Sequence, residues 1–338
     1  MMKKVTIRDI AREAGVSPST VSRVINKSAP VRKELEEKVL EVIKKMGYTP
    51  NLVARSLRKG YTDTVGFIVP DITNPFFSLI IKGAEDFFKK KKISLVVCSS
   101  NHDVKEEEKL IEMLVSKKMD GLLLIGAGSN NRLLSSILNR VKVVFVDRVY
   151  EGYDAPYVVS DNYNGMKKLV WYLVKTGHRS FAFLNGEEGT YSATERLKGF
   201  VDALKEAGIK DYVVFFGQFT YESGFSLVKK LKKIPDAIVC GNDLMAYGAI
   251  DALEEMGYGV PKDVSVTGFD DLPFSKHYKP SLTTVRQPFH AMGYESAKIL
   301  HWMISGKSKE NKKIVLETEL IIRESTKGGS EYETNGNS

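Results

Sequence analysis

The feature that most constrains the fold is a regular alternation of short β-branched runs with helix-length amphipathic segments, from Thr64 to about residue 268. Alternation of this kind is typical of parallel sheets covered by helices, and its two successive sets predict two doubly wound α/β lobes. The expected strands are Val65–Val69, Ser94–Cys98, Gly121–Ile125, Val143–Val146 and Tyr157–Val159, then Ser180–Leu184, Tyr212–Phe216, Ala237–Val239 and Val264–Gly268. The expected helices lie near 75–91, 103–118, 130–139, 162–176, 194–207, 222–232 and 244–256. Ligands bind beyond the carboxyl ends of parallel strands. Two such lobes that face each other form a cleft that can close on a small molecule.

The residues before this alternation follow a purely helical pattern. Thr6 is expected to cap a first helix, with Asp9 completing a capping box, and Gly15 to end it. Ser17 then caps a second helix that has Pro18 at its first position. Two short helices joined by a glycine turn, inside a three-helix unit, are typical of a helix-turn-helix domain. The alternative is a helical bundle with a solvated polar face.

The formal charge is concentrated in the same region. Residues 1–60 contain 14 basic and 6 acidic residues, and the rest of the chain contains 36 of each. The net charge of +8 therefore belongs to this head. A small basic head on a neutral body suggests a module that binds a polyanion. The alternative is a basic surface that serves only solubility.

The second helix presents side chains that suit contacts with DNA. Arg23 can pair with a guanine edge, and hydroxyl groups can contact phosphates or bases. The residues of the head expected to contact DNA are Thr6, Ser17, Pro18, Ser19, Thr20, Ser22, Arg23 and Asn26. Residues 50–60 are too few for a stable isolated helix. They form either a linker or a hinge that folds on DNA, with Leu57 as a minor-groove wedge.

Several motifs of the head recur together in one known family: Val5–Ala11, Ala14–Ser17, Thr20–Asn26, Gly47–Asn51 and Ala54–Leu57. With these motifs the chain resembles the lac repressor (LacI/GalR) family of bacterial transcription regulators. The resemblance implies that the second helix reads the major groove and that Leu57 kinks the operator. It adds these hinge residues to the DNA contacts: Asn51, Ala54, Arg55 and Leu57. Arg32 departs from the family, which usually has a serine cap on the third helix.

The body is similar to the same family through motifs that occur in the family's order: Asp71–Phe77, Val146–Arg148, Ser160–Gly165, Gly177–Arg179, Arg196–Phe200, Gly241–Asp243, Gly268–Asp271 and Leu282–Val285. The resemblance implies a periplasmic-binding-protein-like effector domain. The expected effector-binding residues are Asp71, Phe76, Phe77, Arg148, Asp161, Ser192, Arg196, Phe219, Asn242 and Asp270. Three structural alternatives remain open: either phenylalanine could belong to the core, Asp161 could cap a helix, and Asp270 could serve a turn.

The types of residue in this set indicate the chemistry of the effector. Arginine, asparagine and aspartate side chains together offer donors and acceptors to hydroxyl groups, and an aromatic face can stack on a sugar ring. Thr190 stands where the purine-binding members of the family carry an arginine. The sequence therefore favours a sugar over a nucleobase as the small-molecule effector.

These observations predict the division of the chain. We expect a helix-turn-helix head at 1–49, a hinge helix at 50–60, a two-lobed effector and dimerisation domain at 61–325, and a flexible tail at 326–338. The N-lobe takes residues 61–160 and 290–315, and the C-lobe takes 161–289 and 316–325. The resemblance implies a homodimer on a pseudo-palindromic operator, acting as a repressor whose DNA affinity a small molecule controls.

Other classes of protein fit the sequence less well. Gly126 and Gly128 suggest a dinucleotide loop, but position 131 is Asn where that motif needs glycine, and no other enzyme motif is present. The five histidines lack metal-ligand spacing, so we expect no enzyme, metal or cofactor. Two distant cysteines, no export signal and no apolar run of about 18–20 residues predict a cytoplasmic location. The remaining alternatives are a transport binding protein, which would not need the basic head, and a DNA-binding protein without an effector.

Overall fold

The computed structural model describes residues 5–27, 29–48, 60–126, 137–150, 153–307 and 312–328. The expected hinge contacts Asn51, Ala54, Arg55 and Leu57 lie outside these residues, as does most of the helix expected at 130–139. The chain divides into two compact units, Met1–Thr62 and Asp63–Ser338, and each is described by itself.

The described residues of the first unit form three helices: α1 (Ile7–Ala14), α2 (Pro18–Asn26) and α3 (Lys33–Lys45). The capping box predicted at Thr6 is present, because the Thr6 hydroxyl accepts the Asp9 N–H and the Asp9 carboxylate accepts the Thr6 N–H at 3.0 Å. Gly15 ends α1 in the left-handed conformation, with φ at 67°. Ser17 caps α2 by accepting the Thr20 N–H at 3.2 Å. Arg32 makes no side-chain cap on α3, as the departure at this position predicted.

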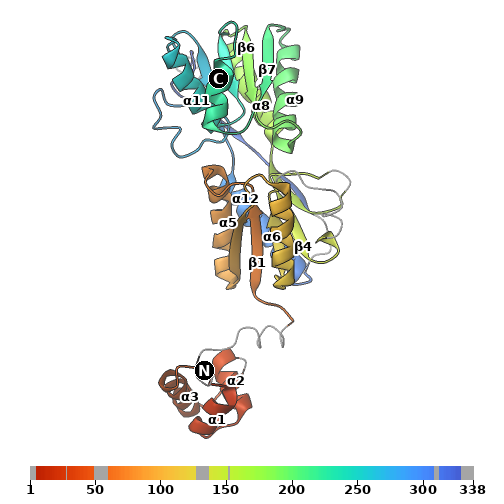
Figure 1. The fold of residues 1–338 in the computed structure, drawn as a ribbon, viewed down its shortest axis with the longest axis vertical. Coiled ribbons are helices and arrows are strands. Elements are labelled where there is room, and N and C mark those ends of the chain that lie inside the picture. Colours follow the sequence, from red (N-terminus) through yellow and green to blue (C-terminus); the bar gives the residue numbers. More distant parts are fainter. Residues whose placement is uncertain are drawn as a thin grey trace, which may run out of the picture. The chain divides into compact units, whose positions relative to one another are not determined.

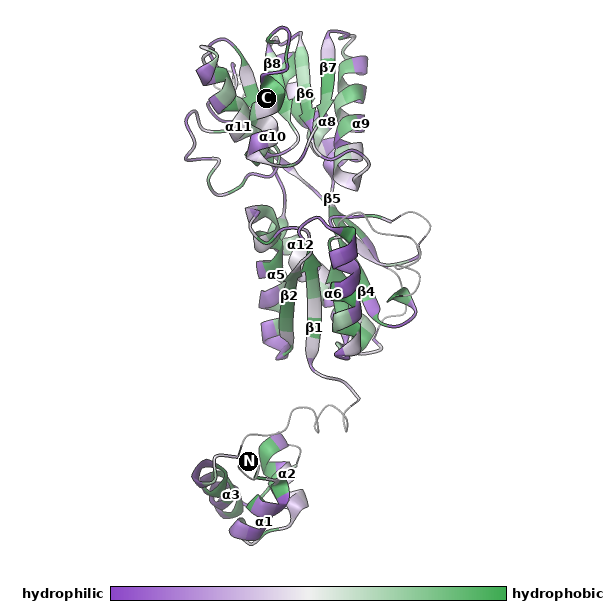
Figure 2. Ribbon diagram, viewed as in Figure 1, coloured by the Kyte–Doolittle hydropathy of each residue, from purple (hydrophilic) through white to green (hydrophobic). Residues whose placement is uncertain are grey.

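The three helices enclose a small apolar core. Its buried members are Ile10, Ala11, Ala14, Val21, Val24, Val39 and Val42. They come from all three helices, so each helix depends on the other two for burial of its apolar face. Figure 2 shows this division between apolar and polar residues on the three helices.

The second unit begins with an N-lobe built on a six-stranded sheet with the order β11-β5-β4-β3-β1-β2. All neighbouring strands in it run parallel. Its elements are β1 (Thr64–Val69), α5 (Pro75–Lys91), β2 (Ser94–Ser99), α6 (Val104–Ser116), β3 (Gly121–Leu124), β4 (Lys142–Val146), β5 (Tyr157–Ser160), α12 (Phe289–Ile304) and β11 (Lys313–Leu316). Phe67 and Val69 of β1 face the core under α5 and α12, while Ile68 faces the core under α6. Both faces of the sheet are therefore buried.

The C-lobe contains a four-stranded parallel sheet with the order β7-β6-β8-β9. Its elements are α8 (Asn162–Lys175), β6 (Phe181–Asn185), α9 (Tyr191–Glu206), β7 (Tyr212–Phe216), α10 (Tyr221–Val228), β8 (Ala237–Cys240), α11 (Asp243–Glu255) and β9 (Ser265–Thr267). Side chains of β6 alternate between a core shared with α8 and α9 and a core shared with α10 and α11. Figure 1 shows these helices around the sheet.

Three segments connect the two lobes. The chain passes from β5 to α8, from β10 (Thr284–Arg286) to α12, and from β11 to β12 (Glu319–Ile321) (Figure 1). β10 and β12 pair antiparallel beside the connections. The elements α12, β10, β11 and β12 are additional to those predicted from the sequence.

The expected flexible tail begins too early. Thr326 is 4% exposed, and its hydroxyl hydrogen-bonds with those of Tyr172 and Thr283 at 2.7 and 3.0 Å. The Lys327 N–H donates to the Ser265 hydroxyl at 3.0 Å. Packed structure therefore continues at least to Lys327, because the Thr326 hydroxyl and the Lys327 N–H are bonded to the C-lobe.

Glycines allow close contact between helices in both lobes. A β-carbon built on Gly293 of α12 would lie 1.9 Å from the carbonyl oxygen of Ile80 in α5, and one on Gly83 of α5 would lie 2.1 Å from that of His290. In the C-lobe, Gly224 of α10 and Gly248 of α11 make the same reciprocal approach at 2.0 Å. Each pair of helices therefore touches backbone to backbone.

We predict that Gly293→Ala destabilises the protein. Alanine normally stabilises a helix interior by about 1 kcal/mol relative to glycine, but overpacking typically costs about 1–3 kcal/mol. Because the clash is with backbone, we expect the overpacking cost to dominate and the melting temperature to fall in calorimetry. Lys89→Ala, on the exposed face of α5, is the control. An unchanged or higher melting temperature for Gly293→Ala would show that α5 and α12 can separate without cost.

Candidate functional site

A pocket lies between the two lobes of the second unit and has about 310 Å³ of space not filled by atoms, part of it open to solvent. Its lining residues are Asn74, Phe76, Phe77, Asp147, Arg148, Ser192, Arg196, Phe219, Asn242 and Asp270. Most of them lie beyond the carboxyl ends of parallel strands, where open sheets bind ligands. The structure therefore brings eight of the ten expected effector residues together in one pocket.

Arg196 of α9 is the central cation of the pocket and is 3% exposed. Its Nε donates to the Asn162 side-chain oxygen at 2.8 Å, and its Nη1 donates to the Gly241 carbonyl at 2.6 Å. Its guanidinium lies 3.8 Å from the centre of the Phe269 ring. Burial lowers the pKa of Arg196, and the neighbouring carboxylates of Asp270 and Asp147 oppose that shift. The guanidinium is thus fixed by neutral acceptors and by an aromatic face.

Asp270 and Asn242 belong to the C-lobe side of the pocket. Asp270 follows β9, is 2% exposed, and accepts a hydrogen bond from the Gln287 amide at 2.6 Å. Burial raises the pKa of Asp270 well above its usual range, and the charge of Arg196 counteracts this rise. Asn242 caps α11 by accepting the Met245 N–H at 2.9 Å. Both side chains are held in place by protein contacts.

Asp147 and Arg148 belong to the N-lobe side and follow β4. Asp147 is 3% exposed and has φ at 57°, and burial raises the pKa of its carboxyl. Within the described part of the chain, Asp147 Oδ1 and Arg148 Nε are buried without a hydrogen-bond partner. The Arg148 Nη1 donates to the Ser192 hydroxyl at 3.4 Å, which joins the two lobes across the pocket. Unpaired buried polar atoms in a pocket are suited to a polar ligand.

The aromatic residues of the pocket also have a structural role. Phe76 and Phe77, at the start of α5, are 6% and 5% exposed and meet edge to face at 5.1 Å. Both belong to the N-lobe core while they line the pocket. Phe76 and Phe77 therefore do both: they pack in the core, and they line the pocket as expected. Phe219 contributes a third ring, 5.6 Å from the Arg196 guanidinium.

Two expected effector residues lie outside this lining. The Asp71 carboxylate accepts the N–H and hydroxyl of Thr73 at 2.8 and 2.7 Å, in the turn before α5. The Asp161 carboxylate caps α8 by accepting the Asn164 N–H at 3.0 Å. Both side chains are used by local structure, as the capping alternative proposed for Asp161.

Sequence reasoning did not select three residues of the site. Asn74 lines the pocket and caps α5 by accepting the Phe76 N–H at 3.0 Å. Asp147 belongs to the motif Val146–Arg148 and follows a predicted strand, and this position at the end of a strand could have identified it. Asn162 orients Arg196, and only the three-dimensional contact reveals this role.

The expected DNA-contacting residues of the head lie on α2 or at its cap, except Thr6, which caps α1. Those classed as exposed are Thr6, Ser17, Pro18, Ser19 and Arg23, while Thr20, Ser22 and Asn26 are partly buried. The Ser17 hydroxyl hydrogen-bonds with those of Ser19 and Thr20 at 2.7 and 2.9 Å, and the Asn26 amide donates to the Ser22 carbonyl at 2.8 Å. The hydroxyls and Arg23 form one polar surface on the second helix of the motif.

None of the described helices combines the length and apolarity needed to cross a bilayer. Among the described residues, no group of three or more histidine, cysteine or acidic side chains is arranged to hold a metal ion.

Comparison with known proteins identifies both parts of the chain. Residues 6–51 match the family of bacterial regulatory proteins called the lacI family, and residues 170–326 match a periplasmic binding protein-like domain. The transcriptional repressor PurR of Histophilus somni is 35% identical over 330 residues, covering 95% of this chain and 99% of that protein. The ribose operon repressor of Halalkalibacterium halodurans is 33% identical over 331 residues, covering 97% and 99%.

Solved structures agree with these relatives. The lac repressor dimer bound to operator and the anti-inducer ONPF has a TM-score of 0.86 and 28% identity, covering 96% of this chain and 99% of that chain. The complex of the transcriptional regulator CelR with cellobiose has a TM-score of 0.74 and 33% identity, covering 95% and 99%. The predicted fold, a helix-turn-helix head with two α/β lobes, is confirmed, and the matched relatives are transcription regulators rather than enzymes. The chain belongs to the LacI family of DNA-binding transcription regulators.

Proposed function

We propose that this protein is a cytoplasmic repressor that binds a pseudo-palindromic operator as a homodimer and responds to a sugar bound between its two lobes. The observation that carries the proposal is the composition of the pocket. Two guanidinium groups, two carboxylates, two amides and three aromatic rings converge there. That set matches a neutral polyhydroxylated ligand, because it supplies donors and acceptors without an excess of either charge.

Effector-binding roles belong, in this proposal, to the pocket-lining residues. Arg148, Arg196, Asn242 and Asp270 bind hydroxyl groups, the aromatic residues contact the apolar face of the ring, and Ser192 adds a hydroxyl. Relatives support a sugar: one is a ribose operon repressor, and one solved structure holds cellobiose. Thr190, in place of the arginine of purine-binding members, points the same way.

The remaining assignments complete the proposal. The polar side chains of α2 contact the operator, and residues 50–60 form the hinge, with Leu57 in the minor groove. The head and hinge keep the boundaries expected from the sequence, while the two-lobed domain extends to Lys327. Effector binding changes operator affinity by favouring one arrangement of the lobes.

A thermal-shift screen of the full-length protein tests the sugar. The panel contains pentoses, hexoses, disaccharides, sugar phosphates and nucleobases. A ligand at 100 times its dissociation constant stabilises its target by about 2.7 kcal/mol, so a true effector raises the melting temperature visibly. A response to one sugar supports the proposal. A response to a nucleobase contradicts the sugar, and no response in any class favours a protein partner or an effector-free regulator.

We predict that Asp270→Asn weakens binding of the sugar identified by that screen. A hydrogen bond to a charged group contributes about 1.5–3 kcal/mol, so affinity falls about tenfold to a hundredfold in calorimetric titration. Operator affinity without the sugar is expected to stay unchanged. Asp71→Asn is the matched control, because Asp71 lies outside the pocket lining. Equal losses in the two variants would show that the pocket is assigned wrongly.

We predict that Leu57→Ala weakens operator binding and leaves sugar affinity unchanged. Partial unstacking of a base step involves a few kcal/mol, so loss of the wedge lowers operator affinity by roughly tenfold or more. The operator probe is a pseudo-palindrome selected from random DNA with the wild-type protein, and binding is measured by fluorescence anisotropy. Leu40→Ala is the control, since Leu40 is exposed on α3. Wild-type operator affinity in Leu57→Ala would exclude the wedge.

A further inference from the structure

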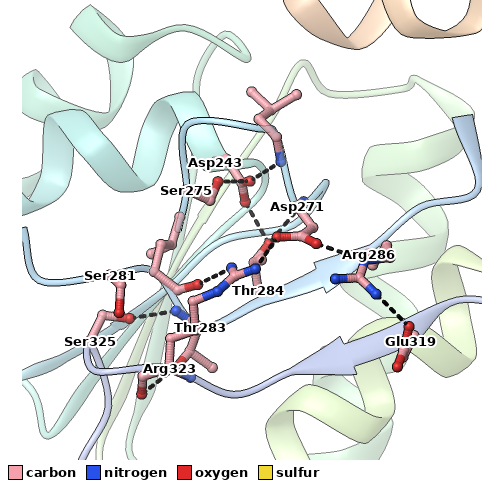
Figure 3. A network of polar contacts seen from close by, with 12 residues as sticks. Asp243, Asp271, Ser275, Ser281, Thr283, Thr284, Arg286, Glu319, Arg323 and Ser325 are labelled. Atoms are coloured by element: carbon pink, nitrogen blue, oxygen red, sulfur yellow. Dashed lines mark hydrogen bonds and ion pairs between the residues drawn. The ribbon is translucent and has the colours of Figure 1, made fainter. Parts of the chain in front are cut away.

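One fully buried carboxylate lies beside the pocket but does not line it. Asp243 is the first residue of α11 and is 0% exposed. Its oxygens accept hydrogen bonds from the Leu272 N–H at 2.8 Å and from the hydroxyls of Ser275 and Thr284 at 2.5 Å each. Figure 3 shows Asp243 between Ser275 and Thr284. One side chain therefore ties α11 to the turn after β9 and to β10.

The turn that Asp243 holds contains the pocket residue Asp270. Asp270 and Asp271 have φ values of 143° and 59°, in the left-handed region that residues other than glycine seldom adopt. Such backbone persists only when its surroundings fix it. The Asp243 N–H donates to the Phe269 carbonyl at 3.0 Å, and its carboxylate accepts the Leu272 N–H. Asp243 thus bonds the residues on both sides of the strained pair.

A second brace acts on the same turn from the outside. The Asp271 carboxylate accepts hydrogen bonds from Arg286 Nε at 2.7 Å and Arg323 Nη2 at 2.6 Å (Figure 3). Arg286 also pairs with the exposed Glu319 at 2.9 Å. These contacts fix Asp271 against β10 and against Arg323, which follows β12. The turn is linked to α11 by Asp243 and by the Tyr247 hydroxyl, which hydrogen-bonds with that of Ser275 at 2.6 Å.

The surroundings of Asp243 are built around its charge. Burial raises the pKa of Asp243 to about 6, and the three donors counteract that rise. The group is therefore ionised at neutral pH, where the positive end of the α11 dipole favours it. A β-carbon on Gly268 would lie 2.2 Å from Asp243 Oδ1, so only glycine at position 268 leaves room for the carboxylate. An ionised group maintained at this energetic cost is typical of a site under functional constraint.

We propose that Asp243 is a positioning residue of the effector pocket, which holds Asp270 and the adjacent Asn242 in their binding positions without touching the effector. The inference rests on the proposed function of the pocket. Asparagine at position 243 keeps the shape of the side chain, but its NH2 group is itself a donor. It would face a donor of the turn or of β10 where the carboxylate offered an acceptor. We therefore expect Asp243→Asn to loosen the turn locally.

Hydrogen exchange of the full-length protein tests the position of the turn without any ligand. In Asp243→Asn, the backbone amides of residues 269–275, apart from Pro273, should exchange at least about tenfold faster, because the lost hydrogen bonds let the turn open. The amides of β6 should keep their wild-type rates. Asp251→Asn is the matched control, because Asp251 is an α11 carboxylate that also accepts hydroxyl donors, from Tyr221 and Tyr278. Ser275→Ala, which removes one donor, replaces Asp243→Asn if that variant does not fold.

Binding of D-ribose and cellobiose provides the second measurement. If the wild type binds either sugar, Asp243→Asn should need at least about tenfold more of it, while Asp251→Asn should not. Unchanged exchange at residues 269–275, or equal acceleration throughout the C-lobe, overturns the positioning role. Local acceleration in a protein that binds neither sugar leaves the positioning role intact and contradicts only the choice of these sugars as effectors.

Discussion

The common direction of the strands is the constraint on which the two-lobed domain depends. Because neighbouring strands within each large sheet are parallel, crossovers must connect them, and the carboxyl ends of all strands in a sheet lie at the same end of that sheet. The pocket-lining side chains, from Asn74 to Asp270, meet beyond these carboxyl ends, although almost two hundred residues separate the two in sequence. The pocket is thus a consequence of topology, and the residue types at the strand ends determine what it can bind.

Because the charged side chains of the pocket are largely buried, each of them interacts more strongly with its neighbours than it would in water. Arg196 is held by two neutral oxygens and a phenylalanine face, and Asp270 by one amide. These contacts leave other polar atoms of the two side chains available to a ligand. Asp147 adds a carboxylate oxygen with no hydrogen-bond partner among the described residues. The protein retains polar groups that its own contacts satisfy incompletely, as binding sites commonly do.

Much of this arrangement could be predicted from the sequence, because its signals are local. The caps at Thr6 and Ser17, the strand runs and eight pocket residues follow from spacing, composition and family motifs. The parts that were missed depend on contacts between distant segments. The helix α12 carries Gly293 in its interior, and only its contact with α5 explains that glycine. Asp71 and Asn74 belong to one motif. The turn before α5 uses the Asp71 carboxylate, so Asn74, which caps α5, lines the pocket instead of Asp71.

The two asparagines that line the pocket have a further consequence for how such a protein diversifies. Asn74 and Asn242 each cap a helix, α5 and α11, with the side chain that also faces the pocket. Replacing either residue to fit a new ligand also removes a cap, which typically contributes about 1 kcal/mol to stability. Ser192 and Phe219 cap no helix. Changes of specificity in evolution should therefore accumulate at Ser192 and Phe219, while the two asparagines stay constant as ligands change.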